Sequence, residues 1–169
     1  MQGSVEQFLN QVARRGSWLG GGSVAAFSAA LSAALLEKLV HQPSVTRQLH
    51  RIRRECLRLV QEDADTFARV IQATRTSDRQ AFRRSLQAAI GVPCRVFAHA
   101  QTLQAVCRRA TRSVNARFHS DLRCAGALAE AAGTASRAFI ETNLAWLGDR
   151  AYARTVRARL RSARSTHAQ

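Results

Sequence analysis

The chain has 169 residues, which is enough for one domain with a hydrophobic core, and no shift in composition divides it. Two prolines and nine glycines interrupt a sequence rich in Ala, Leu, Arg and Gln, a mixture that favours helix and argues against a sheet protein. The formal net charge is +15, and Lys38 is the only lysine, so arginine carries almost all of the positive charge. Such a surface attracts polyanions, but charge alone does not choose between nucleic acid and an oligoglutamate chain.

The cysteines and the N-terminal region bear on the cellular compartment. Cys56, Cys94, Cys107 and Cys124 lie too far apart for a zinc site or a compact disulfide framework. We interpret them as reduced core thiols of a cytoplasmic protein in preference to metal ligands. The arginine pair 14–15 and the uncharged stretch 19–36 superficially resemble a twin-arginine export signal. The glycines and serines of that stretch weaken this alternative, and it is too short and polar to predict a membrane span.

Helical periodicity describes the N-terminal quarter of the chain. A short amphipathic helix is predicted first, with apolar positions Val5, Phe8, Leu9 and Val12. A glycine loop follows, and a second helix should begin near Ser23, whose hydroxyl can cap free backbone N–H groups, and run to about His41. Alanines recur throughout this helix, so we expect it to pack closely and to be buried.

Two long helical segments are predicted next. After Pro43 a third helix covers residues 44–74, with core positions Val45, Leu49, Ile52, Cys56, Leu59, Phe67 and Val70. One member of the same seam is not apolar, and it is Asp63. A capping box from Ser77 to Gln80 should open a fourth helix, which we expect to break or kink at residues 91–93, before Pro93, and to continue as a further seam to Val114.

The C-terminal part completes an all-helical pattern. The chain turns near residues 115–120 into a last long helix over about residues 120–147. Gly148 stops this helix, and Asp149 caps a basic terminal helix over residues 149–165. No segment has strand periodicity, and no repeat is found. The sequence predicts an all-α fold, a single-domain bundle of long antiparallel helices spanning residues 1–169.

Asp63 is the strongest candidate for a functional group. A carboxylate on a buried seam is unfavourable unless it is paired, hydrogen-bonded or facing a cavity. An ion pair with one of the many arginines is the alternative to a role in a cleft, and the pattern alone leaves both open. Asp65, two residues later, should point to solvent.

Asp121 is the second candidate, together with Ser120 and Asn115 at the entry to the last long helix. Serine and aspartate at a helix start are also ordinary caps that interact favourably with the helix dipole, so a purely structural role stays open. His119 could carry a proton beside them, although a solvent-exposed turn residue is the simpler interpretation.

The glycines Gly20, Gly21 and Gly22 precede Ser23 and would let a ligand approach the backbone. They match neither the dinucleotide nor the phosphate-loop spacing, and no strand precedes them. The loop is therefore weak evidence on its own.

Taken together, these segments resemble the motif series of one family. The series comprises Gly20-Gly21-Gly22-Ser23-Val24-Ala25-Ala26, Asp63-Ala64-Asp65-Thr66-Phe67, Val92-Pro93, Asn115 with Ser120-Asp121-Leu122, and Asn143-Leu144. It is similar to that of the formiminotetrahydrofolate cyclodeaminase and methenyltetrahydrofolate cyclohydrolase family over about residues 6–149. The resemblance implies an all-helical homodimer that acts on a tetrahydrofolate derivative and needs no metal or tightly bound cofactor.

The same resemblance assigns roles residue by residue. Asp63 and Asp121 match the acidic positions of the family's motifs and would be catalytic. The substrate-binding positions would be Gly20, Gly21, Gly22, Ser23, Asn115, Ser120 and Asn143. The chain departs from the family's pattern at Leu19, Lys38, Pro43, Val114 and Phe139, where the family has proline, methionine, threonine, glycine and asparagine. Several of these departures lie near the expected site and bear on substrate choice and activity.

Two functions are therefore carried forward. The first is an enzyme that forms or hydrolyses 5,10-methenyltetrahydrofolate. The second is a non-catalytic helical module that binds a polyanion or a protein through arginine-rich faces, such as the stripe from Arg150 to Arg164. Nucleic acid is the less favoured ligand, since nothing resembles a base-reading motif and aromatic residues are few.

Overall fold

The computed structural model describes residues 4–76 and 78–166, with side chains up to residue 162. In these ranges the chain is entirely helical apart from turns, and no strand is present. The helices are α1 (Val5–Ala13), α2 (Gly21–Leu39), α3 (Pro43–Thr74), α4 (Arg79–Ala110), the short 3-10 helix η1 (Ala116–Phe118), α5 (His119–Leu147) and α6 (Arg150–Thr166). The predicted all-α class is confirmed.

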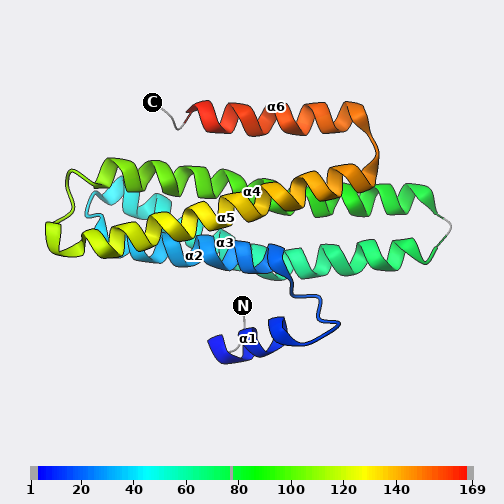
Figure 1. The fold of residues 1–169 in the computed structure, drawn as a ribbon, viewed down its shortest axis with the longest axis horizontal. Helices are drawn as coiled ribbons and strands as arrows, with labels where there is room; N and C mark the ends of the chain where they lie inside the picture. The colour runs from blue at the N-terminus through cyan, green and yellow to red at the C-terminus, as the bar shows by residue number, and fades with distance from the viewer. Residues whose placement is uncertain (1–3, 77, 167–169) are drawn as a thin grey trace.

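Helices α2 to α5 form a bundle, while α1 and α6 lie on opposite sides of it (Figure 1). Helix α2 packs against both α3 and α5, and α4 packs against the same two helices from the other side. Helix α2 has 19 residues and α3 has 32, so α2 covers only part of the length of its neighbour. The residues around the first turn of α2 therefore lie where α3 continues without it.

Local chemistry explains where the helices begin. Ser4 and Gln7 form a reciprocal capping box at α1, and Pro43 occupies the first turn of α3, where its missing N–H costs nothing. The N-cap of α4 is Asp78, whose carboxylate accepts from the backbone N–H groups of Gln80 and Ala81. The predicted capping box used Ser77, which lies outside the described residues. The described cap is the aspartate beside it.

Of the break or kink predicted at residues 91–93, the break is wrong, because α4 continues through Pro93. Proline cannot donate to the carbonyl four residues earlier, which here belongs to Ala89. The side-chain amide of Asn143 on α5 donates to that oxygen at 3.4 Å. A side chain from a neighbouring helix thus replaces the missing backbone donor, and the helix does not need to end.

The buried face of α2 consists mainly of small residues. Ala26, Ala29 and Ala33 have no exposed surface, which lets the neighbouring helices approach closely. The larger side chains Val24 and Leu31 are 37% and 42% exposed. The prediction that α2 is buried therefore holds for one side of the helix and not for the other. Among the described helices α2 alone is long and apolar enough to cross a membrane by length and composition, and half of that stretch is buried inside the bundle. Its packing is that of a core helix.

Helix α6 covers a smaller apolar cluster at one side of the bundle. Ala153 and Val156 pack with Phe97, Ile140 and Leu144. Tyr152 and Leu160 are partly buried against the same cluster, as their spacing predicted. On the outer side Arg157 forms an ion pair with Glu141 of α5. Some of the arginines in this stripe are therefore engaged within the chain.

Candidate functional site

The N-terminal end of α2 is held by a carboxylate from α3. Gly20 is the N-cap residue and has no side chain with which to cap the helix. Asp63 takes over that task, because its carboxylate accepts a hydrogen bond from the backbone N–H of Ser23. The Ser23 hydroxyl lies 3.0 Å from Oδ2 of Asp63 and 2.9 Å from the carbonyl oxygen of Val60. Ser23 therefore does not cap its own helix through its hydroxyl, as predicted, but links α2 to α3.

Glycine is required at two positions of this end by contacts within the chain. A Cβ atom on Gly22 would lie 2.7 Å from Cγ of Asp63, and one on Gly21 would lie 2.6 Å from the Phe139 ring. Such distances are well inside van der Waals contact. Gly20 differs, since a Cβ there would meet nothing within 4 Å. Gly22 thus makes room for Asp63, and Gly21 makes room for Phe139. Of these three glycines, only Gly20 has free space beside its Cα atom.

Asp63 is not neutralised by an arginine among the described residues. The alternative that Asp63 pairs with an arginine is therefore not observed there. The Asp63 carboxylate instead accepts hydrogen bonds from Ser23. Burial raises the pKa of the Asp63 carboxyl above its ordinary value, while the bonds from Ser23 oppose that shift in part. A half-buried carboxyl with a raised pKa and no cation beside it is suited to proton transfer or to stabilising a cationic ligand.

Two aromatic rings pack on each other, one from the loop before α2 and one a turn after Asp63 on α3. Phe67, one turn after Asp63 on α3, was predicted to be a core residue but is 43% exposed. Trp18 from the loop before α2 is 47% exposed and packs on it edge-to-face, with ring centroids 6.2 Å apart. Phe67 is exposed because α2 begins beside Asp63 and does not cover it. The periodicity of α3 alone could not reveal where its neighbour starts.

The second group of candidates lies at the other end of α2. Asp121 forms an ion pair with Lys38 at 3.2 Å, and both side chains are substantially exposed. Asn115 caps η1 by accepting from the backbone N–H of Arg117, and Ser120 is exposed. Since Ser23 and Lys38 are fifteen residues apart on one helix, these groups are separated from Asp63 by about 22 Å. The structure does not bring the two acids together within one subunit.

Asn143 bonds to helix α4. It donates to Ala89, as described above, and is partly buried on α5 one turn beyond Phe139. This bond gives Asn143 a structural task. His119 likewise bonds locally, with Nε2 3.2 Å from the carbonyl oxygen of Val114.

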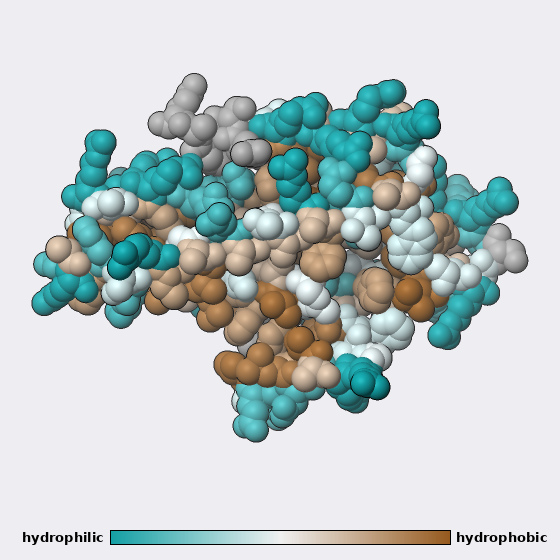
Figure 2. Space-filling model, in the orientation of Figure 1, coloured by the Kyte–Doolittle hydropathy of each residue, from teal (hydrophilic) through white to brown (hydrophobic). Residues whose placement is uncertain are grey.

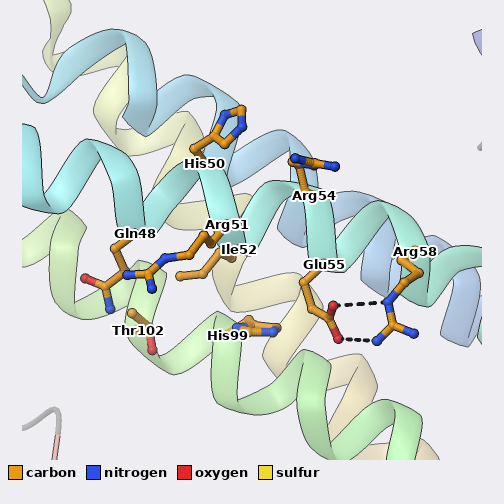
Figure 3. A pocket seen from close by; sticks show the side chains of 9 residues that line it. All are labelled: Gln48, His50, Arg51, Ile52, Arg54, Glu55, Arg58, His99 and Thr102. Atoms are coloured by element: carbon orange, nitrogen blue, oxygen red, sulfur yellow. Dashed lines mark hydrogen bonds and ion pairs between the residues drawn. The ribbon is translucent and has the colours of Figure 1, made fainter.

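A large open groove lies elsewhere on the described part of the chain. It has a volume of about 720 Å³ and lies between α3 and α4, where Arg51, His99 and Thr102 are among the residues that line it (Figure 3). Glu55 in this groove is held by Arg58 at 2.7 Å, and burial lowers the pKa of His99. Smaller grooves lie between other pairs of helices, and Asp63 lines none of them. No cluster of metal-binding side chains occurs among the described residues.

Comparison with known protein families decides the affiliation of this chain. Residues 4–162 match the model of the formiminotransferase-cyclodeaminase family. The chain belongs to this family. The cyclodeaminase fold is also found in the crystal structure of formiminotetrahydrofolate cyclodeaminase from Thermotoga maritima, which is similar with a TM-score of 0.80 and 22% identity. That match covers 98% of this chain and 88% of the other. A sequence comparison with curated proteins found no significant match.

Two positions at which the resemblance predicted other residues can now be placed in this cyclodeaminase-like fold. Phe139 packs on Gly21 at the start of α2. Lys38 pairs with Asp121 at the opposite end of that helix. The side chain of Phe139 thus occupies space beside Gly21, and Lys38 adds a positive charge beside Asp121.

Proposed function

We propose that this protein is a one-carbon folate enzyme that forms or hydrolyses 5,10-methenyltetrahydrofolate. Family membership supports a folate-related function. The observation that carries the proposal is Asp63, a half-buried carboxyl with a raised pKa that is hydrogen-bonded to the start of α2 and has no cation beside it in the described part of the chain. Both reactions pass through a cationic amidinium centre, which such a group can stabilise.

The two reactions place similar demands on Asp63. In cyclodeamination N10 attacks the formimino carbon and ammonia leaves, so protons must move from one nitrogen to the other. In hydrolysis water attacks the methenyl carbon, the bond from that carbon to one nitrogen breaks, and one proton is released. Asp63 would relay the proton or stabilise the cation, and its raised pKa brings it closer to the working pH of a general acid or base.

The surrounding residues would hold the substrate. We assign the open backbone at Gly20 and the hydroxyl of Ser23 to its polar groups, and the exposed rings of Trp18 and Phe67 to a face of the pterin. Asp121, Asn115 and Ser120 would orient the pterin or assist transfer. Exposed arginines would attract the glutamates of the substrate.

The assembly and compartment are part of the same proposal. We propose a cytoplasmic homodimer of single-domain subunits in which the long helices alternate in direction. Supporting this, the start of α2 faces Phe139 late in α5, whereas Lys38 near the end of α2 pairs with Asp121 early in α5. The enzyme would need no metal and no tightly bound cofactor.

The test is an absorbance assay of the purified protein with 5,10-methenyltetrahydrofolate and, separately, with the 5-formimino derivative. Turnover of one of them is expected and identifies the reaction. Folinic acid should also raise the melting temperature, because a ligand that binds the folded state stabilises it. Turnover of neither compound, with steeply salt-dependent binding to nucleic acid and no protection by folinic acid, would instead support a polyanion-binding module.

A further inference from the structure

Basic side chains gather on the first half of α3, away from Asp63. Arg47, Arg51, Arg54 and Arg58 follow one another at intervals of four, three and four residues, which are the spacings of neighbours on a helix surface. Arg51 lies twelve residues before Asp63, about 18 Å along the helix axis. By contrast, Figure 2 shows apolar surface over the middle of the face that α2 and α5 form. The positive charge is therefore uneven, and this part of α3 is one place where it concentrates.

The acids near these arginines are neutralised within the chain. Glu55 is the acid among the described residues that line the groove between α3 and α4, and it pairs with Arg58 at 2.7 Å and with Arg95 at 3.4 Å. The hydrogen bond from Arg58 is the main reason why the pKa of Glu55 is lowered. Glu62 pairs with the same two arginines. Two acids and two bases thus balance one another and leave no negative charge over.

Two cations of the α3–α4 groove remain without an acid. Arg51 and Arg54 line it, and neither forms an ion pair within the described part of the chain. Both side chains are exposed. Figure 3 shows them leaving α3 on different sides, but guanidinium groups three residues apart on a helix can swing toward one ligand. The groove therefore has a positive charge that only a ligand or solvent can meet.

The neighbouring groove on the α2 side of α3 has the same excess. Arg51 lines it together with Arg47, and the acid there is Glu37. That acid is held by Arg53 at 2.7 Å. The local potential around Arg51 is therefore positive on both sides of the helix, which favours an anion at this position.

The rest of the α3–α4 groove is polar without further charge. Gln48 lines it from α3, and His99 and Thr102 line it from α4, beside the buried side chain of Ile52 (Figure 3). Burial lowers the pKa of His99, so its imidazole is neutral at pH 7 and can both donate and accept a hydrogen bond. The volume of about 720 Å³ suits a small molecule, and no aromatic residue among the described lining residues offers a base a stacking partner.

We propose that the α3–α4 groove binds a small phosphate ester whose remaining part carries hydroxyl groups, as in a sugar phosphate. The phosphate would lie against Arg51 and Arg54, and the hydroxyl groups would bond to Gln48, His99 and Thr102. A phosphate monoester carries about 1.5 to 2 negative charges at pH 7 and three acceptor oxygens, which match two guanidinium groups. A single carboxylate matches only one. This site is separate from Asp63 and does not rest on the proposed function.

Calorimetric titration of the purified chain at low salt tests the ligand class. The probes are ribose 5-phosphate, inorganic phosphate, ribose and glutarate, a dicarboxylate of similar charge. Ribose 5-phosphate should bind more tightly than the other three, because only it offers both the phosphate and the hydroxyl groups. Equal or tighter binding of inorganic phosphate would overturn the role of the polar wall. Equal or tighter binding of glutarate would overturn the choice of phosphate, and no binding of ribose 5-phosphate would overturn the site.

The histidines report where the probe binds. His50 and His99 line the α3–α4 groove, whereas His41 does not and His119 lines another groove that also contains arginines. Proton NMR during titration with ribose 5-phosphate should therefore shift the imidazole signals of His50 and His99 and leave those of His41 and His119 in place. Single histidine-to-glutamine variants assign the four signals. Equal shifts at all four would show diffuse attraction of anions to a basic chain, and the site would be wrong.

A charge-neutralising pair of variants separates a specific contact from net charge. Arg51→Gln should raise the Kd of ribose 5-phosphate at least ~10-fold, because it removes a charge-assisted hydrogen bond to the phosphate. Arg154→Gln, the same change at an exposed position of α6, is the matched control and should change the Kd less than ~3-fold, since salt screens a charge outside the groove. Circular dichroism checks that both variants are folded. Equal weakening by the two substitutions would overturn the assignment of Arg51.

Discussion

The two ends of α2 present two carboxylates in contrasting surroundings. At the start of the helix, Asp63 is half-buried and accepts hydrogen bonds from Ser23. It lies so close to Gly22 that a Cβ atom at that position would overlap its carboxyl group. At the other end, Asp121 is exposed and meets the flexible side chain of Lys38 at 3.2 Å. Each lies beside one end of α2. Only the first is built into the packing of the bundle.

This difference indicates which of the two carboxylates is coupled to the stability of the folded chain. A carboxyl removed from water interacts strongly with its neighbours, since the local dielectric is low and solvent cannot screen it. An exposed ion pair contributes about 0–1 kcal/mol and weakens with salt. Changes at the Asp63 end should therefore alter both chemistry and stability, whereas changes at the Asp121 end should leave the subunit's stability nearly unchanged.

The largest effect is expected for Asp63→Asn. The amide keeps the size of the side chain and can still accept from Ser23, so the protein should fold. It cannot relay a proton or stabilise a cation by charge, so turnover should fall at least ~100-fold. Steady-state kinetics beside circular dichroism measure both. Turnover within a few-fold of wild type would remove Asp63 from the reaction.

Gly22→Ala should be the most destabilising change at this end. The new methyl group would lie 2.7 Å from Cγ of Asp63, so the carboxyl or the helix start must move. The cost of such overpacking is about 1–3 kcal/mol. Gly20→Ala is the matched control, since a methyl there meets nothing within 4 Å and only the weaker N-cap preference of alanine, worth less than about 1 kcal/mol, is expected to act. Urea denaturation should show the larger loss for Gly22→Ala, and equal losses would disprove this packing.

A smaller loss, about 1 kcal/mol, is expected for Asn143→Leu, which removes the donor to the Ala89 carbonyl. In a Pro93→Ala background the restored backbone N–H can take that carbonyl, so the same substitution should cost less. A double-mutant cycle by urea denaturation measures the coupling. If the substitution lowered the free energy of unfolding equally in both backgrounds and also abolished folinic acid binding, Asn143 would be a substrate-binding residue instead.

Much of this arrangement could be predicted from the sequence, because helices are local. The long helices and the inward position of Asp63 follow from spacing alone. The wrong expectations depend on contacts between helices. Phe67 is exposed because α2 begins too late to cover it, and Pro93 does not break α4 because a side chain from α5 replaces its donor. Periodicity shows which side of a helix is apolar, but not which neighbour covers it or where that neighbour ends.

The separation of the two acids has the same origin. The resemblance assigned Asp63 and Asp121 to one site, yet the packing of α2 against α5 places Asp121 beside Lys38. Sequence spacing carried no information about this pairing. The missing signal was Lys38 itself, since a basic residue on an otherwise apolar helix face requires an acidic partner or solvent.

The pH dependence of stability should distinguish Asp63 from a solvated acid. Its pKa is raised in the folded state, so the folded protein binds that proton more tightly than the unfolded chain. The resulting stability is full below the ordinary aspartate pKa of about 3.9 and is lost as the pH rises through the raised value. The difference in unfolding free energy between wild type and Asp63→Asn should therefore fall with pH across that acidic window. A difference that grew with pH would mean that the fold favours the carboxylate.

The smallest effect is expected at the other end of α2. Asp121→Asn removes the ion pair with Lys38 but leaves both side chains in water, so the subunit should lose less than about 1 kcal/mol, and less still in concentrated salt. Urea denaturation at low and high ionic strength measures this. Its effect on turnover should nevertheless exceed its effect on stability if the turn contributes to a site in the dimer. A salt-independent loss above about 2 kcal/mol would instead show that Asp121 is as much a part of the packing as Asp63.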